Sequence, residues 1–122
     1  MKTKSLALGA RINSIGFACK GIIKFFQQEP NAWIHLFATL LLFTAVIYFK
    51  VQGSELLALV IVAGMVWVAE AFNTAVEKIM DFISPEYHPK VGFIKDLSAG
   101  AVLLAAITAA ITGTIVFIPK LF

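Results

Sequence analysis

Four polar side chains follow directly on an apolar stretch in the middle of the chain. Residues 56–69 carry no charge, and after them come Glu70, Asn73, Glu77 and Asp81, which we call the polar stripe. On an α-helix these spacings place all four side chains within a sector of roughly 80°. A charge inside an apolar helix is costly unless it is partnered or hydrated, so Glu70, the first of the four, is a candidate functional residue.

Several kinds of chemistry fit the polar stripe. Its carboxylates, with a third from another helix, could hold Mg²⁺, which binds one or two carboxylates together with phosphate oxygens and water. A carboxylate in an apolar environment could act as a general base, and the stripe could also form a path for ions or protons. The structural alternative is a network in which Glu and Asn side chains of the stripe pair with Lys78 or Lys95 and hold helices together.

The sequence contains none of the common nucleotide-binding loops of soluble proteins. It has no Gly-rich loop of the P-loop or dinucleotide type, and no catalytic loop of the protein-kinase type. A nucleotide would therefore have to bind through a metal held by carboxylates, with Lys95 on the phosphates.

The composition identifies an integral membrane protein. Apolar residues make up 60% of the 122 residues and charged residues only 14%, whereas soluble domains have roughly 45–50% apolar residues. A single domain of this size could not bury so much apolar surface, so the excess is expected to face lipid. Cys19 is the lone cysteine, which excludes an intrachain disulfide and a cysteine metal cage.

Residues 6–28 predict an amphipathic helix that lies on the membrane surface. Apolar residues recur on one of its faces at spacings of three and four: Ile12, Ile15, Cys19, Ile22 and Phe26. The opposite side carries Asn13, Lys20 and Lys24, and the lysines would lie among lipid phosphates. The alternative is a helix packed on a soluble core, but the rest of the sequence offers no such core.

Three transmembrane helices are expected, over residues 33–49, 56–83 and 97–118. A polar turn at 50–55 separates the first two spans, and two prolines within 84–90 separate the last two. The final span is rich in Ala and Gly, which permits close helix packing inside a bundle.

The basic residues predict the orientation. With three spans, the N-terminal segment and residues 84–96 lie on one side of the membrane, and Lys50 and Lys120 lie on the other. The first side carries most of the Lys and Arg residues and is therefore expected to be cytoplasmic. The polar stripe then ends on the side where ATP is found.

Five motifs, in the same order and spacing from Arg11 to Ile118, resemble one family, the small bacterial integral-membrane diacylglycerol kinases and the related undecaprenol kinases. The motifs are FACKGI (17–22), EPNAWIH (29–35), ExxNTAVExxxD (70–81), SPEYHP (84–89) and KDLSAGAVLLAA (95–106). The resemblance implies an ATP- and Mg²⁺-dependent kinase that phosphorylates the hydroxyl of a membrane lipid. It also implies a surface helix plus three transmembrane helices in the bacterial inner membrane, assembled as a homotrimer with cytoplasmic active sites between subunits.

The resemblance implies a role for each matched position. Glu70 takes the place of the catalytic base and Asn73 that of a supporting amide. The places of the metal ligands fall on Glu29 and Glu77. The nucleotide-binding places fall on Phe17, Glu29, Glu77, Glu86, Tyr87, His88, Lys95 and Asp96. The places of lipid contacts fall on Arg11, Ser14, Asn31, His35 and Glu70.

Two positions bear on which lipid is phosphorylated. Phe17 stands where the diacylglycerol branch commonly has tyrosine, and the run N-x-x-I-H that ends at His35 resembles the undecaprenol branch. The resemblance thus leaves both lipids open and favours undecaprenol, with His35 as a plain interfacial residue as the alternative. Outside enzymes, the alternatives are a small ion- or proton-conducting oligomer that uses the polar stripe and a structural membrane adaptor.

Overall fold

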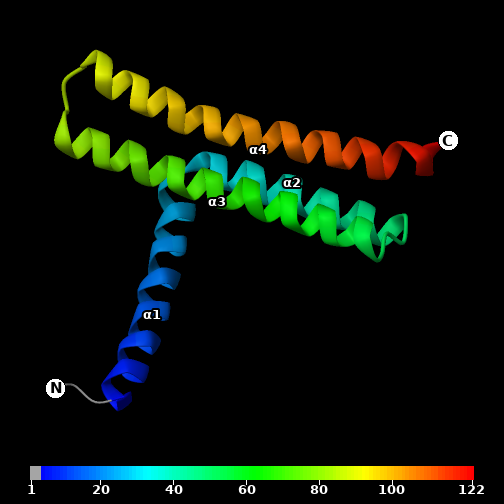
Figure 1. The fold of residues 1–122 in the computed structure, drawn as a ribbon, viewed down its shortest axis with the longest axis horizontal. Coiled ribbons are helices and arrows are strands. Elements are labelled where there is room, and N and C mark those ends of the chain that lie inside the picture. The colour runs from blue at the N-terminus through cyan, green and yellow to red at the C-terminus, as the bar shows by residue number, and fades with distance from the viewer. Residues whose placement is uncertain (1–3) are drawn as a thin grey trace. The chain divides into compact units, whose positions relative to one another are not determined.

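A computed structural model describes residues 4–122, with side chains from residue 7 onward. These residues form four α-helices in sequence: α1 (Lys4–Gln28), α2 (Pro30–Tyr48), α3 (Ser54–Ile83) and α4 (Pro89–Leu121) (Figure 1). Helices α2, α3 and α4 are each long and apolar enough to cross a membrane. The prediction of an all-helical chain with three helices of membrane-spanning length is confirmed. Lys2, which contributes to the basic N-terminal segment, lies outside the described residues.

Each of the three expected spans corresponds to one helix of the structure. The first expected span, 33–49, corresponds to a helix that ends at Tyr48, and the second shares its end, Ile83, with α3. The third expected span, 97–118, lies inside a helix that already begins at Pro89. Proline lacks the backbone N–H and has a helical φ, so it suits the first position of a helix, as it does in both α2 and α4.

The chain divides into two compact units, one ending at Trp33 and the other beginning at Ile34. In the N-terminal unit, the α1 side chains from residue 7 to residue 24 are exposed. Glu29 is the non-helical residue between α1 and α2. The junction is fixed by Trp33, whose indole N–H donates to the Phe26 carbonyl oxygen at 2.8 Å, and whose ring meets the Phe26 ring edge to face at 5.5 Å.

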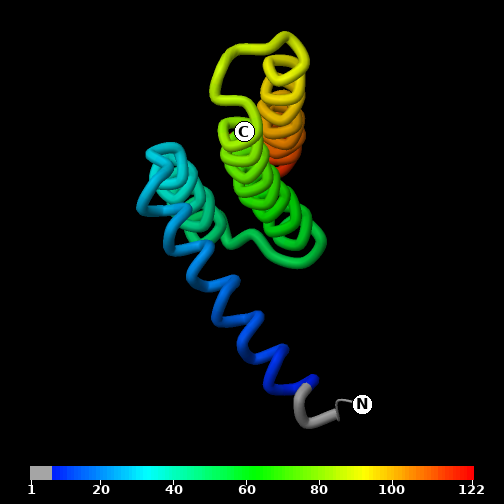
Figure 2. Tube along the Cα trace, turned by 90° about the vertical axis from the view of Figure 1, so that its left-hand side faces the viewer, coloured from blue at the N-terminus to red at the C-terminus, as the bar shows by residue number. Residues whose placement is uncertain are grey.

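In the second unit, α3 and α4 run antiparallel and side by side, joined by residues 84–88 (Figures 1 and 2). Ser84 ends α3, with its N–H donating to the Met80 carbonyl oxygen at 2.9 Å and its hydroxyl donating to the Glu86 carbonyl oxygen at 3.0 Å. His88 caps the start of α4, because its Nδ1 accepts a hydrogen bond from the Lys90 N–H at 3.1 Å. These hydrogen bonds cap the end of α3 and the start of α4 within a short loop.

Ion pairs connect α3 and α4 near both ends of the hairpin. Asp81 pairs with Lys95 close to the connecting loop, and Glu55 pairs with Lys120 at the opposite end, with a distance of 2.9 Å. These side chains are partly exposed, so each pair contributes only about 0–1 kcal/mol to stability. Their main structural effect is to favour one register of the two helices.

The buried core of this unit lies where α2 turns into α3. Val46, Val51, Leu59 and Val116 form a cluster contributed by α2, the turn, α3 and α4. The Val51 N–H donates to the Val46 carbonyl oxygen at 2.9 Å, and Lys50 between them has a left-handed φ of 53°. This is the Schellman ending of a helix, in which the flanking apolar pair makes contact. Burial of that valine pair offsets the strain of a non-glycine residue at Lys50.

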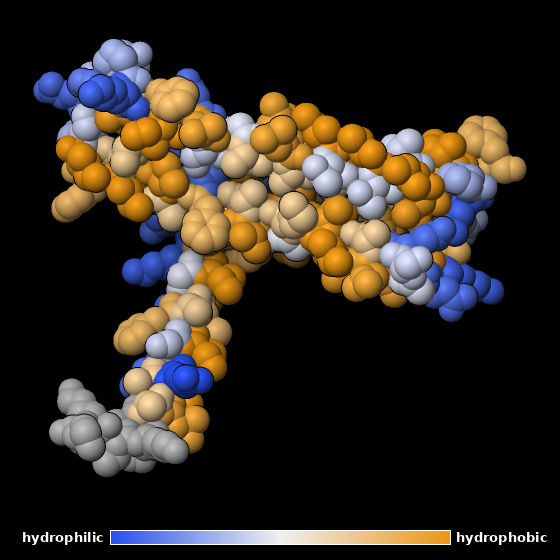
Figure 3. Space-filling model, in the orientation of Figure 1, coloured by the Kyte–Doolittle hydropathy of each residue, from blue (hydrophilic) through white to orange (hydrophobic). Residues whose placement is uncertain are grey.

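The surface of α2, α3 and α4 is mostly apolar between two hydrophilic ends (Figure 3). A helix of 30 residues, the length of α3, is about 45 Å long, whereas the hydrocarbon core of a bilayer is about 30 Å thick. One end of α3 must therefore extend beyond the hydrocarbon core. Because α3 is uncharged from Leu56 to Ala69, the end that extends beyond the core carries the outer residues of the polar stripe, Glu77 and Asp81.

Candidate functional site

The position of each stripe residue along α3 sets its depth. Counted from Leu56, the first apolar residue of α3, Glu70 lies about 21 Å and Glu77 about 32 Å along the helix axis. A hydrocarbon core of about 30 Å that begins at Leu56 would contain Glu70 and end near Glu77. Asp81 lies a further turn beyond. A single helix therefore carries carboxylates from the apolar interior to the aqueous surface.

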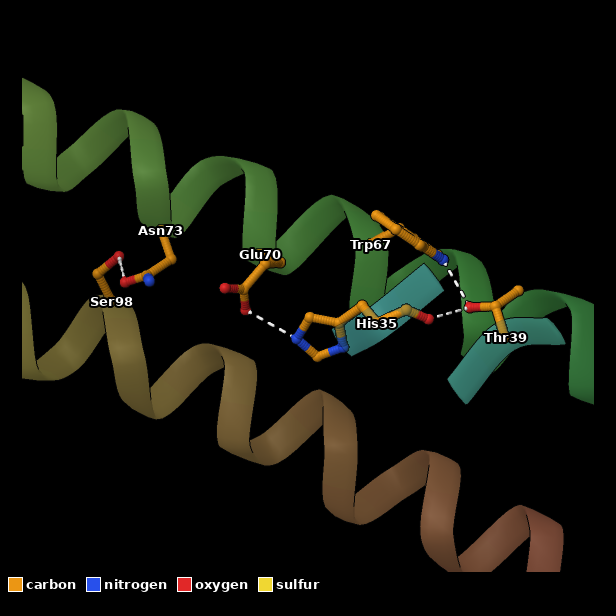
Figure 4. Close-up of polar contacts among 6 residues, drawn as sticks. All are labelled: His35, Thr39, Trp67, Glu70, Asn73 and Ser98. Atoms are coloured by element: carbon orange, nitrogen blue, oxygen red, sulfur yellow. Dashed lines mark hydrogen bonds and ion pairs between the residues drawn. The ribbon is translucent and has the colours of Figure 1, made fainter. Parts of the chain in front are cut away.

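Glu70 is buried and paired with a histidine of another helix. Its residue exposure is 4%, and its Oε2 lies 3.3 Å from Nε2 of His35 in α2 (Figure 4). A buried carboxylate is costly unless it has such a partner. Two of the predicted site residues are thus brought together, one assigned to catalysis and one to the lipid.

Asn73 is oriented by a serine that the sequence reasoning did not single out. The Ser98 hydroxyl, from α4, donates to Asn73 Oδ1 at 2.9 Å (Figure 4). With that oxygen occupied, the amide NH₂ group of Asn73 keeps its donors for another acceptor. The helical period gave a usable signal for Ser98, because it follows Lys95 by three residues and so lies on the same side of α4.

Asp81 and Lys95 meet at the outer end of the stripe through their ion pair. Lys95 thus pairs with the aspartate of the stripe, and it is also the residue that was expected to bind phosphate. Glu86, Tyr87 and His88 follow in the exposed loop between α3 and α4. The loop is shaped by local contacts: a Cβ atom added to Gly92 would come 3.3 Å from the Tyr87 ring.

Glu77 differs from the other stripe members. It is half-buried, and within the described residues it has no hydrogen-bond or ion-pair partner. No group of three or more His, Cys, Asp or Glu side chains in the described part of the chain forms a metal-binding cluster. Mg²⁺ commonly uses one or two protein carboxylates and completes its shell with phosphate and water, so an unpaired Glu77 fits such a donor set.

The remaining predicted site residues belong to the N-terminal unit. Arg11, Ser14 and Phe17 are exposed on α1, and the Ser14 hydroxyl donates to the Ala10 carbonyl oxygen at 2.9 Å. Glu29 lies at the α1–α2 junction and Asn31 in the first turn of α2. Asp96, in the other unit, is exposed on the first turns of α4.

Two further residues surround the Glu70–His35 pair. The Trp67 indole N–H donates to Thr39 Oγ1 at 2.9 Å, and the Thr39 hydroxyl donates to the His35 carbonyl oxygen at 2.7 Å. The sequence reasoning missed both residues. Trp67 precedes Glu70 by three residues, and this i, i+3 spacing on an apolar helix was the available signal.

These contacts provide a buried carboxylate and an amide with free donors on α3, followed by a lysine of α4 that meets the outer end of the stripe. The carboxylate can accept a proton at membrane depth. The amide and the lysine can donate to anionic oxygens closer to the water.

Comparisons with known proteins give a consistent family. The family model described as prokaryotic diacylglycerol kinase matches residues 16–117. A diacylglycerol kinase of Synechocystis is 33% identical over 109 residues, which cover 88% of this chain and 62% of that protein, so the chain spans less than two thirds of this relative's length. An undecaprenol kinase of Bacillus subtilis is 30% identical over 104 residues, or 85% of each chain. A diacylglycerol kinase of Escherichia coli K12 is 31% identical over 101 residues, or 83% of each chain.

Proposed function

The chain belongs to the prokaryotic diacylglycerol kinase family, and we propose that it transfers the γ-phosphate of ATP to the hydroxyl of a membrane lipid. The similar proteins are named diacylglycerol kinase and undecaprenol kinase, and both names specify a lipid alcohol as acceptor. The observation that carries the proposal is Glu70, a buried carboxylate at membrane depth on a helix that continues to the surface. The hydroxyl belongs to a lipid, so its base must lie within reach of the bilayer interface, whereas ATP approaches from water.

In the proposed reaction, Glu70 is the general base. The oxygen of the lipid hydroxyl attacks the γ-phosphorus while the O–H bond breaks and its proton moves to the Glu70 carboxylate. The bond between the γ-phosphorus and the bridging oxygen breaks, and its electron pair leaves with ADP. Asn73 supports the reacting oxygens through its amide NH₂ group, since Ser98 occupies its Oδ1. Positioning and charge stabilisation supply most of the rate in such transfers.

The nucleotide is proposed to bind at the outer end of the stripe. Lys95 would exchange Asp81 for a phosphate oxygen, which likewise accepts a charge-assisted hydrogen bond. Further contacts are assigned to Phe17, Glu86, Tyr87, His88 and Asp96. In His88, Nδ1 is used in capping α4, so its Nε2 is the atom left for a ligand.

Mg²⁺ is proposed to be held by Glu29 and Glu77 together with the phosphates of ATP. When bound, the ion would neutralise phosphate charge. Glu77 suits this role because it is half-buried and has no protein partner within the described residues. Both glutamates would also contact the nucleotide through the metal.

We further propose that the protein is a homotrimer in the bacterial inner membrane, with active sites between subunits. α1 would lie on the cytoplasmic membrane surface, and the Lys and Arg excess of the N-terminal segment supports this orientation. Arg11, Ser14, Asn31 and His35 are assigned to the lipid.

The proposed preferred acceptor is undecaprenol. The support is Phe17 in place of tyrosine and His35 at the end of the N-x-x-I-H run, together with the contact of His35 to the proposed base. No observation in the described residues favours an ion-conducting function over the kinase.

The acceptor is tested by competition. Purified protein in bilayers receives equal mole fractions of undecaprenol and diacylglycerol, with Mg²⁺ and ATP labelled in its γ-phosphate. The proposal predicts that most lipid-bound label is in undecaprenyl phosphate. Preferential labelling of phosphatidic acid would overturn the acceptor and leave the lipid kinase, whereas label in neither lipid would overturn both.

A further inference from the structure

The contact between His35 and Glu70 is built between two helices. His35 Nε2 lies 3.3 Å from Glu70 Oε2, and Figure 4 shows the imidazole directed at that oxygen with the other carboxylate oxygen turned away from it. Glu70 is 4% exposed. Because one oxygen is engaged by His35, the second is left to accept a proton from another group.

His35 is itself held in place by the helix that carries Glu70. The Thr39 hydroxyl donates to the His35 carbonyl oxygen at 2.7 Å and accepts from the Trp67 indole N–H at 2.9 Å. The Trp67 and His35 rings meet edge to face, with centroids 6.1 Å apart. Trp67 and Glu70, one turn apart on α3, thereby contact Thr39 and His35, one turn apart on α2.

The cross-helix contact distinguishes Thr39 from other threonines of these helices. Thr44 donates to the Leu40 carbonyl oxygen at 2.8 Å, the same bond to the residue four positions earlier that Thr39 makes. Within the described residues, however, Thr44 has no hydrogen bond to another helix. The Thr39–Trp67 bond is therefore an additional link, and it fixes the side of α2 from which His35 projects.

We infer that His35 is a positioning residue for Glu70: its Nε2 holds Oε2, so that Oε1 is presented to the lipid hydroxyl. The Trp67–Thr39 bond maintains this arrangement by fixing His35. The inference rests on the proposed function, in which Glu70 is the base, and it changes the role of His35 from contacting lipid to acting through Glu70. Misplacing a catalytic group by about 1 Å can cost up to about 100-fold in rate.

The test uses four single variants of the full chain. His35→Leu removes the contact of Nε2 with Glu70, and His35→Gln offers an amide NH₂ group in its place. Thr39→Val breaks the link to Trp67, and Thr44→Val is the matched control. An apolar cavity of about 210 Å³ borders His35, Thr39 and Trp67, so these side chains can be replaced without overpacking. Thermal unfolding of each variant identifies any that fail to fold.

We expect His35→Leu to lower kcat by about 10- to 100-fold with KM for ATP and for lipid nearly unchanged. His35→Gln should recover much of that loss, Thr39→Val should lower kcat less than His35→Leu does, and Thr44→Val should match wild type. A loss in His35→Leu that appears only in KM for lipid would assign His35 to substrate binding and overturn the inference.

The decisive comparison repeats His35→Leu in a Glu70→Gln background. If His35 acts through Glu70, adding His35→Leu to Glu70→Gln changes the residual rate by less than about twofold. A difference of that size is within the usual scatter of such double-mutant comparisons. An equal loss in both backgrounds would show that His35 acts independently of Glu70 and would overturn the positioning role alone. A folded wild-type protein that labels no lipid would instead overturn the proposed function, and the positioning role with it.

Discussion

Replacing Glu70 by glutamine is expected to abolish most turnover while the fold survives. The change is nearly isosteric and removes only the ability to accept the proton. Glu70 is 4% exposed, and Glu77 lies two turns away, about 10 Å along the helix, so neither bulk water nor the next carboxylate can replace it. General-base catalysis contributes about 10²–10⁴-fold, equivalent to about 2.7–5.5 kcal/mol in the activation barrier. We expect a loss of at least the lower value.

Nucleotide affinity and unfolding temperature, measured on the same Glu70→Gln preparation, distinguish a catalytic role of Glu70 from a structural one. Nucleotide affinity should persist, because the groups assigned to ATP are unchanged, and the unfolding temperature should hold or rise, because a buried carboxylate becomes a neutral amide. If the Glu70–His35 pair served only to join helices, Glu70→Gln would instead lower the unfolding temperature, because breaking a buried ion pair lowers the free energy of unfolding by about 3–5 kcal/mol.

Glu55→Gln is the matched control. It removes another ion-paired carboxylate of α3, at the end of the helix opposite to Asp81. We expect wild-type turnover for this variant, measured as labelled γ-phosphate transferred to lipid. Near-normal turnover in Glu70→Gln would refute the assignment of Glu70 as base, whatever happened to stability.

Three other substitutions test the outer part of the site. Glu77→Gln removes a proposed metal ligand and should raise the Mg²⁺ concentration needed for half-maximal rate; an unchanged Mg²⁺ titration would remove Glu77 from the metal site. Asp81→Asn frees Lys95 from its ion pair and should leave stability within about 1 kcal/mol of wild type while lowering KM for ATP, and a higher KM would contradict the exchange of Asp81 for phosphate. Ser98→Ala releases Asn73 Oδ1 and should lower kcat by about tenfold or less, read from initial rates, whereas a change in KM alone would argue against its orienting role.

The helices could be predicted from the sequence because their signals are local. Long uncharged runs, prolines and polar turns placed the three helices of membrane-spanning length, and the spacing of the stripe placed its four residues on one side of α3. The early start of α4 was not predicted, because residues 89–96 are polar and a hydropathy pattern marks only the membrane-embedded part of a helix. The ending at Lys50 was also unpredictable, since burial of Val46 and Val51 overrides the preference for glycine at a left-handed φ.

The cross-helix partners could not be predicted to the same extent. Lys95 was expected to pair with Glu and Asn side chains of the stripe or to bind phosphate, and in the structure it forms an ion pair with Asp81. The partners His35 for Glu70 and Ser98 for Asn73 depend on the register and rotation of one helix against another, which no local spacing specifies. Thr39 was missed for the same reason. Trp67 was missed despite its i, i+3 spacing to Glu70, because a tryptophan on an apolar helix is ordinarily a packing residue.

Phosphate transfer from ATP to a lipid alcohol is tested most directly by following the label. Folded, purified wild-type protein in bilayers is incubated with Mg²⁺, ATP labelled in its γ-phosphate, and undecaprenol or diacylglycerol in separate reactions, and label is then counted in the extracted lipid. If the protein is a lipid kinase, label is found in the lipid of at least one reaction, and this labelling is lost when Mg²⁺ is chelated. Label that stays in ATP and inorganic phosphate with both lipids would contradict the proposed function.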